Sequence, residues 1–75
     1  MGKAAFSYEI KKHIATLSES GDGDFTTELN LISYNGASPK LDLRKWDRRT
    51  DKMLKGITLT TEEAINLREA LTAAI

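Results

Sequence analysis

In residues 40–46 two leucines alternate with charged residues and a tryptophan, and this two-residue period is the feature that most constrains the fold. One parity holds Leu41 and Leu43, and the other holds Lys40, Asp42, Arg44 and Trp46. A period of two residues is typical of a β-strand that buries one face and exposes the other. We therefore predict a strand that directs its leucines into the core and places Trp46 on a solvent-exposed outer face.

A second segment, residues 25–34, pairs with this strand. Residues 35–39 carry the turn sequence Asn-Gly-Ala-Ser-Pro, so the two segments are predicted to form a hairpin. The apolar face of residues 25–34 is assigned to the core and consists of Phe25, Leu29 and Leu31. The other face lies on the same outer surface as Trp46 and consists of Thr26, Glu28, Asn30, Ile32 and Tyr34.

Two further strands flank the hairpin. Residues 8–20 follow the two-residue period imperfectly, which a bulge or a long curved strand explains, and residues 19–24 form the turn that follows. Residues 53–59 form the last strand. Regular alternation would bury the charge of Lys55, so we interpret Gly56 as a bulge or bend that leaves Lys55 exposed.

A helix follows the last strand. Thr60 and Glu63 have the spacing of a capping box, a feature worth about 1 kcal/mol. Leu67, Leu71 and Ile75 belong to an apolar stripe at helical spacing. Part of the stripe covers the sheet, and the remaining apolar surface near these three residues predicts a homodimer interface, because so short a chain buries only a modest core.

Composition limits the class of protein. Seventy-five residues make one domain, 1–75, in which we expect residues 1–7 to be flexible. The absence of cysteine excludes disulfides, zinc–cysteine sites and thiol nucleophiles. His13, the only histidine, has no evident partner, so we predict a structural or surface role for it, no metal, no cofactor and no enzymatic activity. With no membrane-spanning apolar run and no leader, we expect a soluble, cytoplasmic protein without a membrane partner.

Charge is distributed unevenly along the chain. Lysine plus arginine and aspartate plus glutamate both number 11, but residues 40–55 hold seven cations and three acids, a net charge of +4. A local field steers a polyanion more than the total charge does, because salt screens charges beyond about 8–10 Å. The cluster is either a solvated hairpin or a polyanion-binding surface.

Two short segments carry a resemblance to a known family. They are residues 41–46 (LDLRKW) and residues 55–59 (KGITL), followed at once by an acid-started helix. Their order and spacing, over about residues 25–71, resemble the family of the transcriptional coactivator positive cofactor four (PC4), and especially its small bacterial members of the YdbC type. The resemblance implies an α+β fold, with a curved four-stranded antiparallel sheet and one C-terminal helix. It also implies a homodimer paired through the helices that binds single-stranded DNA across the sheets, without metal or catalysis.

Individual positions match the family pattern. Tyr34 takes the place of a family aromatic before the hairpin turn, and Arg44 that of a strand arginine. Trp46 lies in the aromatic-rich strand end, and Lys55 belongs to a basic Lys-Gly-Ile segment. Ile32 stands where the eukaryotic form has a cation. The first strand and its acidic loop also differ, and the serine-rich regulatory tail is absent, so we do not expect the coactivator role to carry over.

The leading hypothesis is a non-catalytic, sequence-tolerant binder of single-stranded DNA, serving replication, repair or transcription. Aromatic side chains would stack on bases and cations would neutralise phosphates. Single-stranded RNA is an alternative ligand, since stacking does not select the sugar. A protein–protein interaction module that docks an acidic partner or a polymerase is the alternative function. The predicted binding residues are Asn30, Tyr34, Lys40, Arg44, Lys45, Trp46 and Lys55.

Overall fold

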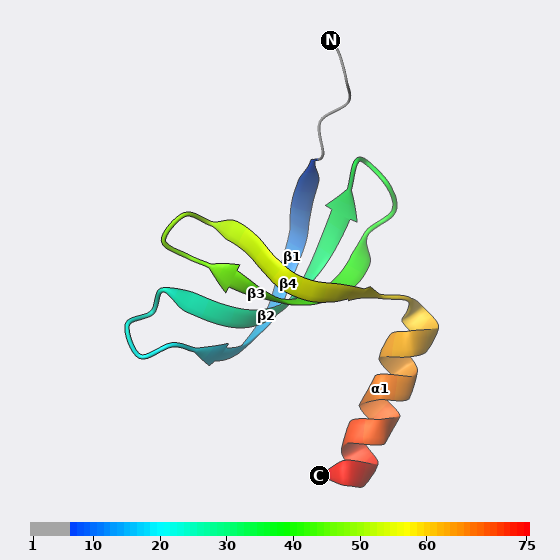
Figure 1. Ribbon diagram of the computed structural model, residues 1–75. Coiled ribbons are helices and arrows are strands. Elements are labelled where there is room, and N and C mark those ends of the chain that lie inside the picture. The colour runs from blue at the N-terminus through cyan, green and yellow to red at the C-terminus, as the bar shows by residue number, and fades with distance from the viewer. Residues whose placement is uncertain (1–6) are drawn as a thin grey trace.

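The computed structural model describes residues 7–75 as four strands followed by one helix (Figure 1). The elements are β1 (Tyr8–Glu19), β2 (Phe25–Tyr34), β3 (Lys40–Asp47), β4 (Lys52–Leu59) and α1 (Thr61–Ala74). Each strand pairs antiparallel with the next, and the order in the sheet is the order in the chain. The predicted fold class is confirmed. Most of the lead-in predicted to be flexible, residues 1–6, lies outside the described residues.

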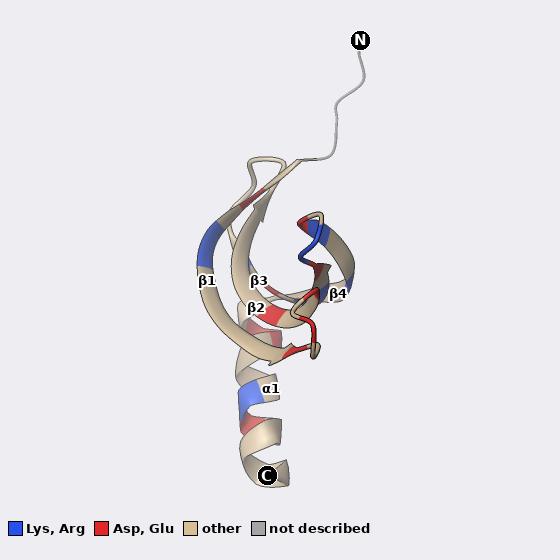
Figure 2. Cartoon of the chain, turned by 90° about the vertical axis from the view of Figure 1, so that its left-hand side faces the viewer, with Lys and Arg blue, Asp and Glu red and all other residues tan. Residues whose placement is uncertain are grey.

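Irregular pairing of β1 with β2 curves the sheet. The register shifts at three places along β1, between Ile10 and Lys12, between His13 and Ala15, and between Thr16 and Ser18. An extra residue in one strand bends that strand and increases its twist. In Figure 2, β1 and β2 accordingly form the strongly curved left-hand side of the sheet, β4 lies on the right, and α1 extends below the strands. The bulge predicted within residues 8–20 is therefore confirmed, and the structure contains three such irregularities.

The two faces of the sheet have the composition that the alternation predicted. Direct partners in an antiparallel pair point to the same side of a sheet. The leucine face holds Leu29, Leu31, Leu41, Leu43, Ile57 and Leu59. The tryptophan face holds Thr26, Glu28, Asn30, Ile32, Tyr34, Asp42, Arg44 and Trp46.

Solvent exposure of these faces is the reverse of the prediction. Trp46 is only 1% exposed, and Ile32, Asn30 and Asp42 beside it are also buried. On the leucine face Leu59 is buried, whereas Ile57 is exposed and the other leucines are half-buried. The prediction that Trp46 faces solvent is wrong, because the curved sheet wraps around the tryptophan face and brings distant side chains over it.

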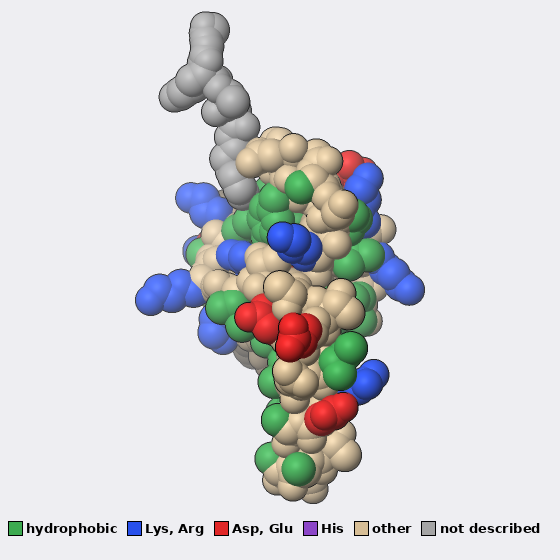
Figure 3. Space-filling view, turned by 90° about the vertical axis from the view of Figure 1, so that its right-hand side faces the viewer, with side chains coloured by type: hydrophobic (Ala, Val, Ile, Leu, Met, Phe, Trp, Pro, Cys, Tyr) green, Lys and Arg blue, Asp and Glu red, His purple; other side chains and the backbone are tan. Residues whose placement is uncertain are grey.

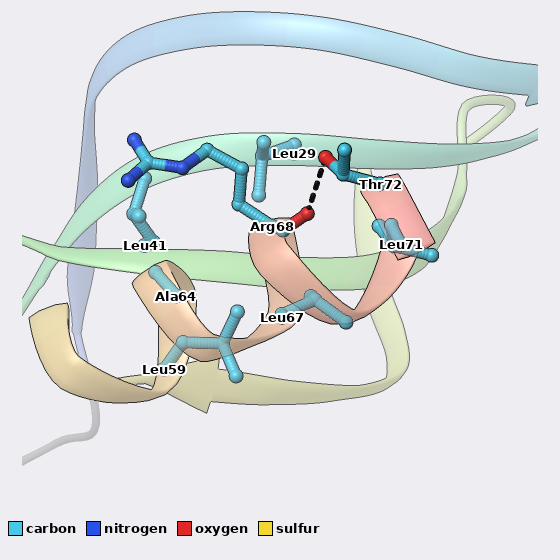
Figure 4. A pocket seen from close by; sticks show the side chains of 8 residues that line it. All are labelled: Leu29, Leu41, Leu59, Ala64, Leu67, Arg68, Leu71 and Thr72. Carbon is cyan, nitrogen blue, oxygen red and sulfur yellow. Dashed lines mark hydrogen bonds between the residues drawn. The ribbon is translucent and has the colours of Figure 1, made fainter. Parts of the chain in front are cut away.

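Helix α1 begins as predicted and packs only lightly. Thr60 and Glu63 form both hydrogen bonds of the capping box, from Glu63 N to Thr60 Oγ1 (3.0 Å) and from Thr60 N to Glu63 Oε1 (2.8 Å). No residue of α1 is buried. A groove of about 340 Å³ runs between α1 and the leucine face (Figure 4). It is lined by Leu29, Leu41, Leu59, Ala64, Leu67, Arg68, Leu71 and Thr72.

Candidate nucleic-acid interface

Asp42 is the centre of a hydrogen-bonded cluster on the tryptophan face. Its fully buried carboxylate accepts hydrogen bonds from the Tyr34 hydroxyl (2.5 Å), from Arg44 Nε (2.6 Å) and Nη2 (2.7 Å), and from Thr58 Oγ1 (3.3 Å). Arg44 Nη2 also donates to the Tyr34 hydroxyl (3.2 Å). Two predicted binding residues, Tyr34 and Arg44, are thus joined through Asp42, which the sequence analysis did not identify as part of the site.

The protonation states of this cluster follow from its contacts. Burial acts to raise the pKa of the Asp42 carboxyl, but the hydrogen bonds from Arg44 and Tyr34 outweigh it, so the pKa is lowered. Burial and the hydrogen bond to Asp42 raise the pKa of Tyr34. The hydrogen bond to Asp42 raises the pKa of Arg44. At neutral pH the cluster therefore holds an ionised carboxylate, a charged guanidinium and a protonated phenol that orients both.

Arg48 connects the β3–β4 turn to β2. Its Nε and Nη2 atoms donate to the two carboxylate oxygens of Glu28, at 2.9 Å and 2.5 Å, and its Cζ lies 4.5 Å from the centroid of the Trp46 ring. A bidentate arginine–carboxylate pair is stronger and geometrically more specific than a neutral hydrogen bond. In the sequence Arg48 is only one of the seven cations of residues 40–55, because nothing in the local pattern connects it with a residue 20 positions earlier.

Glu28 is held ionised by its neighbours. Burial acts to raise its pKa, but hydrogen bonds from Arg48, Thr26 and Asn30 lower the pKa to about 2. Thr26 Oγ1 donates at 2.5 Å and Asn30 Nδ2 at 3.3 Å. The predicted binding residue Asn30 is thus on the tryptophan face but buried, and its Oδ1 is 2.7 Å from His13 Nδ1.

Tyr8 adds a third aromatic ring to this face. Its ring centroid is 6.5 Å from that of Tyr34 and 5.9 Å from that of Trp46, with the ring planes tilted. Tyr8 lies at the start of β1, so it reaches Trp46 only because the sheet is curved. The only available sequence signal was its shared parity with Ile10 at the start of the first strand, which does not identify a binding residue.

The predicted lysines lie in different places. Lys40 is an exposed residue on the edge of the tryptophan face, paired with Ile32. Lys45 points to the opposite side, where its Nζ donates to Thr27 Oγ1 (3.1 Å). Lys55 is exposed beside a register shift in the β3–β4 pair, so the predicted bulge near Gly56 is confirmed. Contacts of these lysines with nucleic acid stay predictions.

The residues predicted for a dimer lie on α1 or directly after it. Leu67 and Leu71 line the groove, and Ile75 is 98% exposed at the end of the chain. Hydrophobic side chains are visible along α1 and at its junction with the sheet (Figure 3). Across residues 7–75 no group of histidine, cysteine or acidic side chains could hold a metal ion, and no helix is long and apolar enough to cross a membrane.

Comparison with known proteins places this fold in a family. A family model described as transcriptional coactivator p15 (PC4) matches residues 24–70. An uncharacterized protein of Treponema pallidum (strain Nichols) is 46% identical over 66 residues, which cover 88% of this chain and 76% of the relative. The matched region contains β2, β3, β4 and most of α1, including the Tyr34–Asp42–Arg44 cluster. The chain therefore belongs to the family of the transcriptional coactivator p15 (PC4), a non-catalytic family that binds single-stranded DNA.

Proposed function

We propose that this protein binds single-stranded nucleic acid, with DNA as its ligand, across the tryptophan face and the adjoining β3–β4 turn. The observation that carries the proposal is the cluster of Tyr34, Asp42 and Arg44 beside Trp46. It places aromatic rings and a charged guanidinium on one curved surface. Aromatic rings on which bases stack, next to cations that follow the backbone, are typical of proteins that bind single strands without sequence preference.

Exposed lysines supply the long-range attraction. Lys40 and Lys55 are exposed, and neither of them forms an ion pair with another residue in the range 7–75. The arginines are different, because Arg44, Arg48 and Arg49 each pair with an acid on the chain. We therefore assign phosphate neutralisation first to the lysines. Arg44 has the different role of holding the Tyr34 side chain in place.

A second copy of the chain completes the molecule in this proposal. The groove beside α1 is almost wholly apolar, and leaves Leu71 48% exposed. A chain this short buries a smaller fraction of its surface than a larger domain does, and a two-fold symmetric contact uses the same patch on both copies. We propose that Leu67, Leu71 and Ile75 of two copies cover each other's grooves, which places two tryptophan faces in one homodimer.

Fluorescence anisotropy tests the ligand class. Labelled single-stranded DNA, duplex DNA and single-stranded RNA of equal length are titrated with the protein at two salt concentrations. We expect single strands to bind more tightly than the duplex, whose bases are already stacked, and affinity to fall as salt rises. Equal affinity for all three, without dependence on oligonucleotide length, would instead favour a protein-docking surface.

A further inference from the structure

Trp46 is covered, although a stacking residue must be accessible to a base. It is 1% exposed, with the Arg48 guanidinium over its ring and Tyr8 beside it. Its Nε1–H is buried and has no hydrogen-bond acceptor among residues 7–75. A buried donor without an acceptor costs free energy, so a ligand oxygen that reached Nε1 would remove that cost.

Arg48 is held by contacts that a phosphate can replace. Its side chain is 29% exposed, so a polyanion can reach it while it is bound to Glu28 and to Asp51 (3.3 Å). Phosphate and carboxylate both accept the planar guanidinium fork in bidentate fashion. The Arg48 backbone N–H is fixed separately to the Asp24 carbonyl (2.6 Å), so only the side chain has to move.

Departure of Arg48 would not leave Glu28 without donors. The hydrogen bonds from Thr26 and Asn30 remain, and they are independent of the β3–β4 turn. Protonation cannot release the pair near neutral pH, because the pKa of Glu28 lies at about 2. A competing anion is therefore the effective trigger.

Building on the proposed function, we propose that Arg48 is an exchangeable lid over Trp46. A backbone phosphate of the bound strand takes the guanidinium from Glu28, and the side chain swings away. The exposed indole then stacks on a base, and its Nε1–H donates to an oxygen of the nucleic acid. Arg48 therefore covers the Trp46 ring until the phosphates of a nucleic-acid strand bind the guanidinium.

The single tryptophan reports the lid directly. Acrylamide quenching of Trp46 emission is measured without DNA in the wild type, in Glu28→Gln and in Asp47→Asn. Asp47 is the matched control, because it pairs with Arg49 in the same turn, but Arg49 lies over Phe25 rather than over Trp46. Both substitutions remove one negative charge. We expect quenching to rise at least twofold in Glu28→Gln only. The affinity of this variant for single-stranded DNA should also rise about fivefold, because the closed state, in which Arg48 covers Trp46, no longer competes with DNA binding.

Two further measurements separate the lid from the proposed function. An abasic deoxyribose–phosphate oligomer, added to the wild type, should raise the acrylamide quenching of Trp46, because phosphates alone suffice for the exchange. Single-stranded DNA that binds without changing Trp46 emission or accessibility would overturn the lid and leave DNA binding intact. Unchanged quenching in Glu28→Gln would also overturn it. Should Glu28→Gln fail to fold by circular dichroism, Arg48→Lys, which keeps the charge but loses the bidentate fork, takes its place with the same expected rise.

Discussion

Gly56 lies directly against Arg44 across the β3–β4 pair: a Cβ atom at residue 56 would stand 1.9 Å from Arg44 Cβ and 2.6 Å from Arg44 Cα. No rotamer change relieves an overlap with backbone atoms. We expect Gly56→Ala to lower the free energy of unfolding by about 3 kcal/mol or more, since overpacking typically costs 1–3 kcal/mol even where side chains can move. Urea denaturation measures the loss. The control is Gly21→Ala, which has no atom within 4 Å of its new methyl group and should change little.

Trp46 is a core residue of the isolated chain, so truncating it should affect folding before binding. We expect Trp46→Ala to lower the free energy of unfolding by about 3–5 kcal/mol, the usual cost of removing a buried aromatic ring. Leu17→Ala serves for comparison, because Leu17 is largely exposed and such changes usually stay within about 0.5 kcal/mol. Equal, small losses in the two variants would show that Trp46 is not part of the core in solution.

Stability should depend on pH through Glu28. Its pKa is lowered to about 2 in the folded chain from an ordinary value of 4.5, so its contribution is complete above the ordinary value and disappears as the pH falls toward 2. The shift corresponds to about 3 kcal/mol, at 1.36 kcal/mol per unit of pKa. Unfolding free energies of the wild type and Glu28→Gln, measured from pH 7 to pH 2.5, should differ most at pH 7 and converge in acid. A constant difference would mean that the Arg48 pair does not lower the pKa of Glu28.

Salt dependence should identify which cations contact phosphates. Each neutralised phosphate of a single strand contributes about −0.7 to the slope of log affinity against log salt. We expect Lys55→Ala to make the slope shallower by about 0.7 per subunit engaged and to weaken binding to every sequence alike. Lys12→Ala is the charge-matched control, because Lys12 pairs with Leu31 on the leucine-face side of the sheet. If the control flattens the slope as much as Lys55→Ala does, binding is not confined to the proposed surface.

The oligomeric state tests the groove beside α1. Sedimentation equilibrium of the wild type at micromolar concentration should give about twice the monomer mass of 8.3 kDa. A charge at Leu71 would be buried in the proposed interface, so Leu71→Asp should sediment as a monomer. Ile65→Asp places the same charge at an exposed α1 residue that does not line the groove, and it should remain dimeric. A monomeric wild type would contradict the proposed homodimer.

Part of the candidate site could be predicted because it depends on local parity. Tyr34 and Arg44 have the same parity as Trp46 in their hairpin, and the structure brings Tyr34 and Arg44 together around Asp42. Asp42 itself was missed, because a single acidic side chain on a charged strand face is expected to be exposed to solvent. Its role becomes visible only when donors from β2, β3 and β4 converge on it.

The sequence by itself determined the order of the elements, the two faces of the hairpin, the bulged first strand and the Thr60–Glu63 capping box. Each of these follows from steric or hydrogen-bonding preferences that act within a few residues. Only the tertiary structure decided which face is buried. Side-chain alternation assigns residues to sides of a sheet, but it contains no information on curvature. Curvature places Tyr8 beside Trp46, and the turn after β3 brings Arg48 to Glu28. Trp46 is therefore buried, although the alternation in its strand predicts that this face is exposed.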